Sequence, residues 1–256
     1  MKNLALDGPK LKIERATAHI ADVRAHVINF LSTSPCEMFT CVGPGEGEEC
    51  IKVRLITEPP AEIAVICGEI IYGLRSALDQ LACALATQNG YADVSGTYFP
   101  FAGSKDEFET TSNRKKISKL SPAAVPLIDS LKPYKGGNDL LWALNKLGNT
   151  DKHQMLLPMA AANLGAQLQL TGRPLGTMEH TFKVPKSWQL LDPDATIFIY
   201  PAGMHLNGEI TVLTDISFRS INTVAGQPIV TVLEQFANLI EEIIGVFQKR
   251  FFEGTL

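Results

Sequence analysis

The chain has 256 residues, of which 45% are hydrophobic and 20% are charged, and its formal net charge is -4 at pH 7. This composition is typical of a folded protein and excludes a disordered chain. The acidic balance also excludes a protein that coats nucleic acid over its whole surface by charge.

The first part of the chain predicts a helix followed by a β-hairpin. Over residues 12–33, apolar residues repeat every seven positions in two series, which makes a narrow stripe of the kind that packs against other helices. Segments 36–42 and 49–56 are strand-like, and a glycine-rich turn at 43–48 joins them. We therefore expect a hairpin at residues 36–56.

A long apolar helix follows the hairpin. It opens at the proline pair 59–60 and ends near the turn signal at 89–90. Apolar residues lie on nearly every side of it, so we expect this helix to be the central, buried one. Because Glu69, Arg75 and Asp79 interrupt the apolar run, and roughly 20 uninterrupted residues are needed to span a bilayer, we expect no membrane segment.

The middle of the chain predicts shorter elements. Residues 91–113 lack a regular period and are expected to be irregular, whereas 114–131 predict a helix that two prolines interrupt. Asn138 is a suitable N-cap for the helix that follows it.

Beyond residue 153 the apolar period changes to two, which predicts an antiparallel sheet. A final helix at 228–252 carries a strong apolar stripe, and we expect it to pack on the sheet or to rejoin the helices. The predicted fold class is α+β: a helical bundle with an N-terminal β-hairpin and a C-terminal antiparallel sheet closed by a long helix. The division is expected at 1–153 and 154–256, within one integrated domain. The predicted strands are 155–161, 166–171, 179–184, 196–200 and 209–218.

The five cysteines are odd in number, and none shows the two-residue spacing of a zinc or redox motif. Cys67 and Cys83 lie in the apolar helix and resemble small core residues. Together with a start that has no long apolar region, this favours a reduced, cytoplasmic protein.

Two polar groups stand out as a candidate ligand-binding site. Arg75 and Asp79 are four residues apart on the apolar helix, so they either form an ion pair within that helix or line an internal pocket. The second group consists of Asn145, Asn149, Asp151 and His153. Asn145, Asn149 and His153 share one helical face, and the alternative interpretation is an ordinary helix C-terminus. Arg75 and His153 are the candidate catalytic residues if the protein is an enzyme.

A weaker signal for anion binding precedes the same helix. Lys135, Gly136, Gly137 and Asn138 combine a lysine with backbone amides near a helix start, which suits a phosphate, although the sequence favours a plain turn with an N-cap. No spacing typical of a metal site or of a cofactor motif occurs, so we expect no metal and no cofactor.

Two segments resemble an uncharacterised bacterial protein family: Leu74 to Leu81, with sequence LRSALDQL, and Leu144 to His153, with sequence LNKLGNTDKH. The first is also similar, more distantly, to the Arg-x4–6-His helix motif of HEPN-type ribonucleases. Arg75 matches that motif, but the position five residues later is Gln80 instead of histidine. The resemblance to HEPN proteins implies a helical, usually dimeric protein that binds or cuts RNA, often in defence systems.

Two functions follow as hypotheses. The first is a non-catalytic binding or assembly protein, a homodimer whose polar pocket between helices takes a small anionic or nucleotide-like ligand. The second is a HEPN-like ribonuclease or RNA-binding protein that uses the basic stretch 114–152, which contains eight basic and three acidic residues. The absence of a complete catalytic motif favours the first.

Overall fold

The computed structural model describes residues 4–152, 156, 158–171, 180–191, 194–219, 221 and 223–253. They fall into two compact units. The first comprises Met1–Arg24, Ala64–Leu156 and Val230–Leu256, and the second comprises Ala25–Ile63 and Leu157–Ile229. Segments from both sides of residue 153 therefore contribute to each unit.

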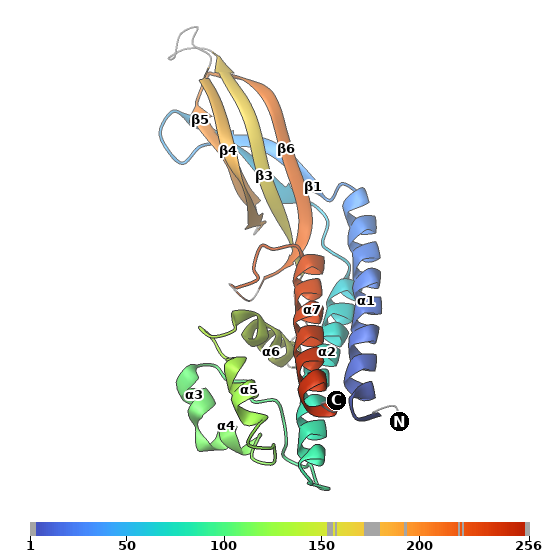
Figure 1. The fold of residues 1–256 in the computed structure, drawn as a ribbon. Helices are drawn as coiled ribbons and strands as arrows, with labels where there is room; N and C mark the ends of the chain where they lie inside the picture. The colour runs from blue at the N-terminus through green and yellow to red at the C-terminus, as the bar shows by residue number, and fades with distance from the viewer. Residues whose placement is uncertain are drawn as a thin grey trace. The chain divides into compact units, whose positions relative to one another are not determined.

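The first unit is helical (Figure 1). The helices of the chain are a short 3-10 turn at Leu4–Leu6, α1 (Asp7–Ser32), α2 (Ala61–Gln88), α3 (Lys105–Glu109), α4 (Thr111–Lys115), α5 (Val125–Ser130), α6 (Asp139–Asp151), α7 (Ile229–Phe247) and a π-helical turn at Gln248–Phe252. Helices α1, α2 and α7 lie side by side as the long helices, and α3 to α6 are shorter (Figure 1).

Helices α1 and α2 run antiparallel. Gly8, near the start of α1, lies beside Gln80 near the end of α2, and His19 Nε2 lies 3.7 Å from Glu69 Oε2. The heptad positions of α1 are buried as predicted, including Ile20 at 4% exposure. The apolar stripe thus meets the neighbouring helices, since burying it is what stabilises an amphipathic helix.

Helix α2 is buried along most of its surface, as its apolar composition predicts. Leu74, Leu78 and Leu81 are fully buried. One stripe departs from the expectation of an all-round buried helix, because Val65 is 55% exposed and Tyr72 is 62% exposed.

The final helix, α7, belongs to the helical unit. Of the two expected positions, on the sheet or with the other helices, it therefore takes the second. Its stripe residues Leu233, Phe236 and Ile240 are fully buried, and Arg24 of α1 pairs with Glu234 at 2.5 Å. None of the helices within the described ranges is both long and apolar enough to cross a membrane.

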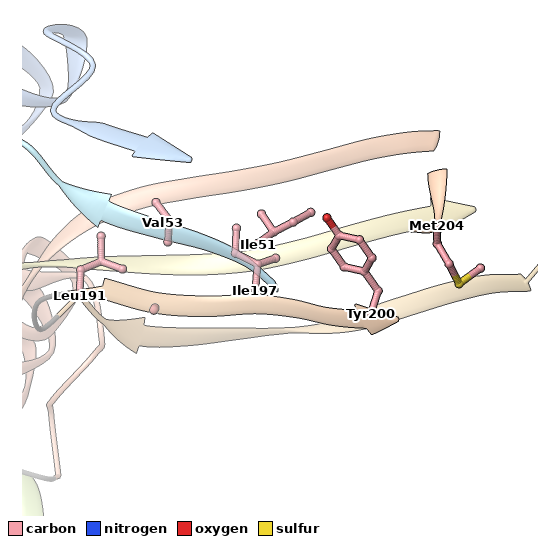
Figure 2. Close-up of a cluster of buried hydrophobic side chains, with 7 residues drawn as sticks. Ile51, Val53, Leu191, Ile197, Tyr200 and Met204 are labelled. Carbon is pink, nitrogen blue, oxygen red and sulfur yellow. The ribbon is translucent and has the colours of Figure 1, made fainter. Parts of the chain in front are cut away.

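The second unit holds two three-stranded antiparallel sheets. Their strands, in sheet order, are β1 (Cys36–Val42), β2 (Glu48–Leu55) and β5 (Asp194–Pro201), and then β4 (His180–Leu190), β3 (Pro158–Thr171) and β6 (His205–Phe218). The predicted hairpin is β1–β2, and β5 extends it by pairing with β2. A hydrophobic cluster along β2 and β5 includes Ile51, Val53, Ile197 and Tyr200 (Figure 2).

The α+β fold class is confirmed, with differences in detail. Two predicted strands merge into β3, whose single run covers 166–171 and the part of 155–161 from residue 158 onwards. The segment expected to be irregular contains α3 and the first three residues of α4, and these helices begin after the capping residues Ser104 and Thr110. These helices are only five residues long, too short for a clear helical period, and their caps are their main local signal.

A disulfide joins Cys41 and Cys50 across the hairpin. The two residues are direct partners in the β1–β2 register, with Cα atoms 5.2 Å apart, a separation that a disulfide accepts. This bond was not predicted, because the strand register and not a sequence motif brings the two thiols together. Cys36, Cys67 and Cys83 are free.

Candidate functional site

Helix α6 crosses the helical unit in close contact with α2, and two glycines permit the approach. A Cβ at Gly148 would lie 3.3 Å from Ile71, and a Cβ at Gly68 would lie 2.6 Å from the Asp151 carboxylate. Because α6 residues meet α2 residues in reverse order, the two helices are antiparallel. Arg75 of the first predicted group therefore meets Asn149 of the second.

A cleft of about 250 Å³ opens beside this contact. Four of the predicted site residues line it, together with five residues of the segment before α3, Glu107 of α3, and Lys116. Its lining residues are Arg75, Asp79, Tyr98, Phe99, Phe101, Ala102, Gly103, Glu107, Lys116, Asn145 and Asn149.

Arg75 links the two helices. Its Nη1 atom donates a hydrogen bond to Oδ1 of Asn149 at 2.9 Å, and its guanidinium lies 5.6 Å from the centre of the Phe101 ring. The Nε atom of Arg75 is buried and has no hydrogen-bond partner among the described residues. A buried donor without a partner is unfavourable by about 1–3 kcal/mol.

Asp79 does not pair with Arg75, so the interpretation of an ion pair within α2 is wrong. Its Oδ1 atom instead accepts a hydrogen bond from the backbone N–H of Phe99 at 2.9 Å. This bond attaches the segment before α3 to the central helix. Burial raises the pKa of the Asp79 carboxyl, while the Phe99 hydrogen bond and the nearby Arg75 oppose the rise.

Asn145 supplies an unused acceptor to the cleft. Its Oδ1 atom is buried and, within the described part of the chain, has no hydrogen-bond partner. Asn145 and Arg75 thus bring an orphaned acceptor and an orphaned donor to the same cleft. Most buried polar groups in native proteins are hydrogen-bonded, so these two atoms are exceptions, as is Oε1 of Gln80 outside the cleft.

Lys116 and Glu107 line the cleft and were not predicted as site residues. The Lys116 ammonium donates to Oδ1 of the buried Asn113 at 2.6 Å and to the Phe101 carbonyl at 3.4 Å. Burial lowers the pKa of Lys116. The only signal in the sequence was that Lys116 belongs to the basic stretch 114–152, which contains too many lysines to single one out.

Asp151 lies outside the lining of the cleft, against Gly68 of α2. Burial raises the pKa of the Asp151 carboxyl. The pKa of the Cys67 thiol is raised mainly by burial, and the negative charge of Asp151 raises it further. Asp151 forms no ion pair within 4.0 Å with another described residue. His153, the remaining member of the predicted site, lies outside the described residues.

The predicted anion-binding turn uses its own backbone amides. The N–H of Gly136 donates to Asp139, that of Gly137 to Tyr134, and that of Asn138 to the Lys132 carbonyl. Asn138 is the N-cap of α6, since its side chain accepts from Leu141 N at 3.0 Å. The simple interpretation, a turn followed by an N-cap, therefore accounts for this segment, and Lys135 lies over the Trp142 ring.

Comparison of the chain with protein-family models, with curated proteins and with solved structures gives no match. The function is therefore argued from the cleft.

Proposed function

We propose that the chain is a binding protein whose cleft between α2, α6 and the segment before α3 takes a small anionic ligand, such as a phosphate or carboxylate compound or part of a nucleotide. The observation that carries this proposal is the orphaned pair of buried polar atoms, Arg75 Nε and Asn145 Oδ1. Arginine binds carboxylates and phosphates well because its donors match the two oxygens of the anion.

The proposal is tested by titrating phosphate, acetate, succinate and AMP into the protein and measuring heats of binding. Arg75→Lys keeps the charge but removes the Nε donor. Since a hydrogen bond to a charged group is worth about 1.5–3 kcal/mol, affinity for a bound anion should fall about 10-fold or more. Arg24→Gln is the control, because Arg24 pairs with Glu234 in α7 and does not line the cleft.

Two results would contradict the proposal: none of the four anions binds, or Arg75→Lys binds them as tightly as the unmodified protein. Native mass spectrometry of gently purified protein complements the titration. A retained small molecule would identify the ligand directly, and its loss from Arg75→Lys would link it to the cleft.

A ribonuclease related to HEPN proteins is the alternative proposal, with Arg75 stabilising charge at the phosphate. Two observations weigh against it. Gln80, at the motif's histidine position, lies beside Gly8 of α1 and does not line the cleft. The basic stretch is also partly neutralised, because Arg114 pairs with Asp129 at 2.6 Å. RNA cleavage that is lost in Arg75→Ala and retained in Arg24→Gln would favour this alternative.

Self-association as a homodimer belongs to the same proposal. It is supported by large apolar side chains that are exposed on the helices, with Leu11 at 62%, Val65 at 55% and Tyr72 at 62% exposure. Light scattering during size-exclusion chromatography measures the assembled mass. Tyr72→Ser and Val65→Ser should shift a dimer towards the monomer if this stripe forms the interface.

The cytoplasm is the proposed location, on the evidence of the three free cysteines. The Cys41–Cys50 disulfide weighs against a strongly reducing compartment, where such bonds are rare. Free thiols are alkylated inside the cell of origin, and the protein is then tested for the Cys41–Cys50 bond. A reduced pair would favour the cytoplasm, and an intact disulfide would favour a less reducing compartment.

A further inference from the structure

The charges that line the cleft are of both signs. Arg75 and Lys116 are cations, and Asp79 and Glu107 are anions. No ion pair within 4.0 Å joins any two of these four described side chains. Partly buried charges that do not neutralise one another are unfavourable, and a ligand with complementary charges would relieve this.

The two cations, Arg75 and Lys116, retain free donors. Arg75 uses Nη1 on Asn149, while its Nε has no partner within the described ranges. Lys116 directs its ammonium at Asn113 and the Phe101 carbonyl, which accounts for two of its three hydrogens. The remaining donors suit the two oxygens of a carboxylate.

The two carboxylates, Asp79 and Glu107, retain free acceptors. Asp79 uses Oδ1 for the Phe99 N–H, and no partner is found for its Oδ2 among the described residues. Glu107 accepts from the Gly103 N–H through Oε2 at 2.6 Å, and again only one of its two oxygens is used. With the orphaned Oδ1 of Asn145, these acceptors suit the three hydrogens of an ammonium group.

The size of the cleft limits the ligand. About 250 Å³ holds roughly eight water molecules at about 30 Å³ each, which corresponds to on the order of ten non-hydrogen atoms. The volume is below the usual range of drug-sized pockets, about 300–1,000 Å³. Phe99 and Phe101, whose ring centres are 4.9 Å apart, add an apolar wall to the polar lining.

We propose that the ligand of this cleft is a small zwitterion of the free amino-acid class, with its carboxylate at Arg75 and Lys116 and its ammonium at Asp79 and Glu107. This inference rests on the proposed binding function and narrows it from anions in general to molecules that carry both charges. It assigns the acidic lining a binding role, which a site for a simple anion would not need.

The test uses isothermal titration of the full chain with each of the twenty amino acids. The tightest binder is then compared with its deaminated carboxylate and its decarboxylated amine. The zwitterion should bind at least about 10-fold more tightly than either analogue, because each analogue leaves either the two cations or the two carboxylates of the cleft without a partner. In Asp79→Asn and Glu107→Gln the advantage over the carboxylate should shrink, while Asp22→Asn, an exposed change in α1, should preserve it.

The outcomes separate this inference from the proposed function. If the deaminated carboxylate binds as tightly as the amino acid, the proposal of a zwitterionic ligand is wrong and the proposal of anion binding stands. If phosphate and carboxylates bind but no amino acid does, the zwitterion proposal is likewise wrong and anion binding stands. If neither amino acids nor anions bind, both proposals fail. Asp79→Asn is nearly isosteric and keeps an oxygen for the Phe99 N–H, and Glu107→Gln provides an independent variant should either fold poorly.

Discussion

The carboxylate of Asp151 lies directly over Gly68, where a Cβ atom would come within 2.6 Å of one of its oxygens. The contact joins the end of α6 to the beginning of α2, on the same pair of helices that carries Arg75 and Asn149. Glycine at this position is therefore required by the packing of a charged side chain and not by the backbone of α2.

The first prediction compares two glycines of α2. Replacing a glycine by alanine inside a helix stabilises it by about 0.5–1 kcal/mol. A Cβ at Gly73 would meet only the Lys12 carbonyl at 3.9 Å, so Gly73→Ala should show this gain in chemical unfolding. Gly68→Ala must displace the Asp151 carboxylate, so its gain should be smaller or reversed.

A double variant identifies the cause. Gly68→Ala in an Asp151→Ala background should recover the gain seen for Gly73→Ala, because the obstructing carboxylate is gone. Equal effects of Gly68→Ala and Gly73→Ala in the unmodified protein would show that Asp151 does not occupy this position in solution.

The second prediction concerns the pH dependence of stability at Asp79. Its pKa is raised in the folded protein by burial, so between the ordinary value of 3.8 and the raised value the folded state binds more protons than the unfolded state. The contribution of Asp79 to the free energy of unfolding therefore falls as pH rises through this window. Asp79→Asn lacks the effect, so its stability relative to the unmodified protein should be higher at pH 7 than at pH 3.

Asp93 provides a control of opposite sign. Hydrogen bonds from Ser95 lower the pKa of its carboxyl, so its contribution is present above the ordinary value of 3.8 and is lost as pH falls below it. The stability of Asp93→Asn relative to the unmodified protein should therefore be lower at pH 7 than at pH 2. Urea unfolding at each pH measures both variants, and a pH-independent difference for Asp79→Asn would contradict the burial argument.

The third prediction concerns Asn113, a buried residue behind the cleft with 3% exposure. Its Nδ2 donates to the carbonyls of Pro100 and Phe108, both at 3.2 Å, and its Oδ1 accepts from Lys116. Asn113→Ala removes all three hydrogen bonds and leaves buried carbonyls without partners. We expect a loss of roughly 2–4 kcal/mol in the free energy of unfolding.

Asn89→Ala is the matched control, because Asn89 makes a single exposed hydrogen bond to the Lys119 carbonyl at 3.0 Å. Asn89→Ala should lower the free energy of unfolding by less than about 1.5 kcal/mol. If the two variants are equally stable, Asn113 does not hold the segment before α3. Asn113→Ala should also weaken anion binding, because Lys116 is then no longer oriented towards the cleft.

The fourth prediction concerns the disulfide. Cys41 and Cys50 close a short loop, with a sequence separation of 9 residues, and a loop of that length is expected to contribute about 2–3 kcal/mol. Cys41→Ala/Cys50→Ala should unfold at a correspondingly lower denaturant concentration. Cys36→Ala and Cys83→Ala alter free thiols and serve as controls for cysteine replacement.

Thiol counting under denaturing, non-reducing conditions checks the pairing itself. The structure predicts three reactive thiols before reduction, those of Cys36, Cys67 and Cys83, and five after it. Five reactive thiols before reduction would show that Cys41 and Cys50 are only neighbours in the hairpin.

Helical spacing in the sequence located four of the eleven residues that line the cleft. Asn145 and Asn149 were expected on one face of a helix because they are four residues apart, and both line the cleft with Arg75 and Asp79. The expected ion pair between Arg75 and Asp79 was wrong, because both found partners outside α2: Asn149 in α6 and the Phe99 N–H. Local spacing shows which groups are able to meet, but not which competing partner is better placed.

The sequence by itself determined the α+β class, the amphipathic helices and the hairpin, because these depend on periodicity and turn residues within short segments. It also placed Asn138 as the N-cap of α6. Only the tertiary structure decided that β5 joins the hairpin, that Cys50 faces Cys41, and that Lys116 reaches the cleft beside Arg75. These relationships depend on strand register and on packing between distant segments, which many residues determine together and no local pattern records.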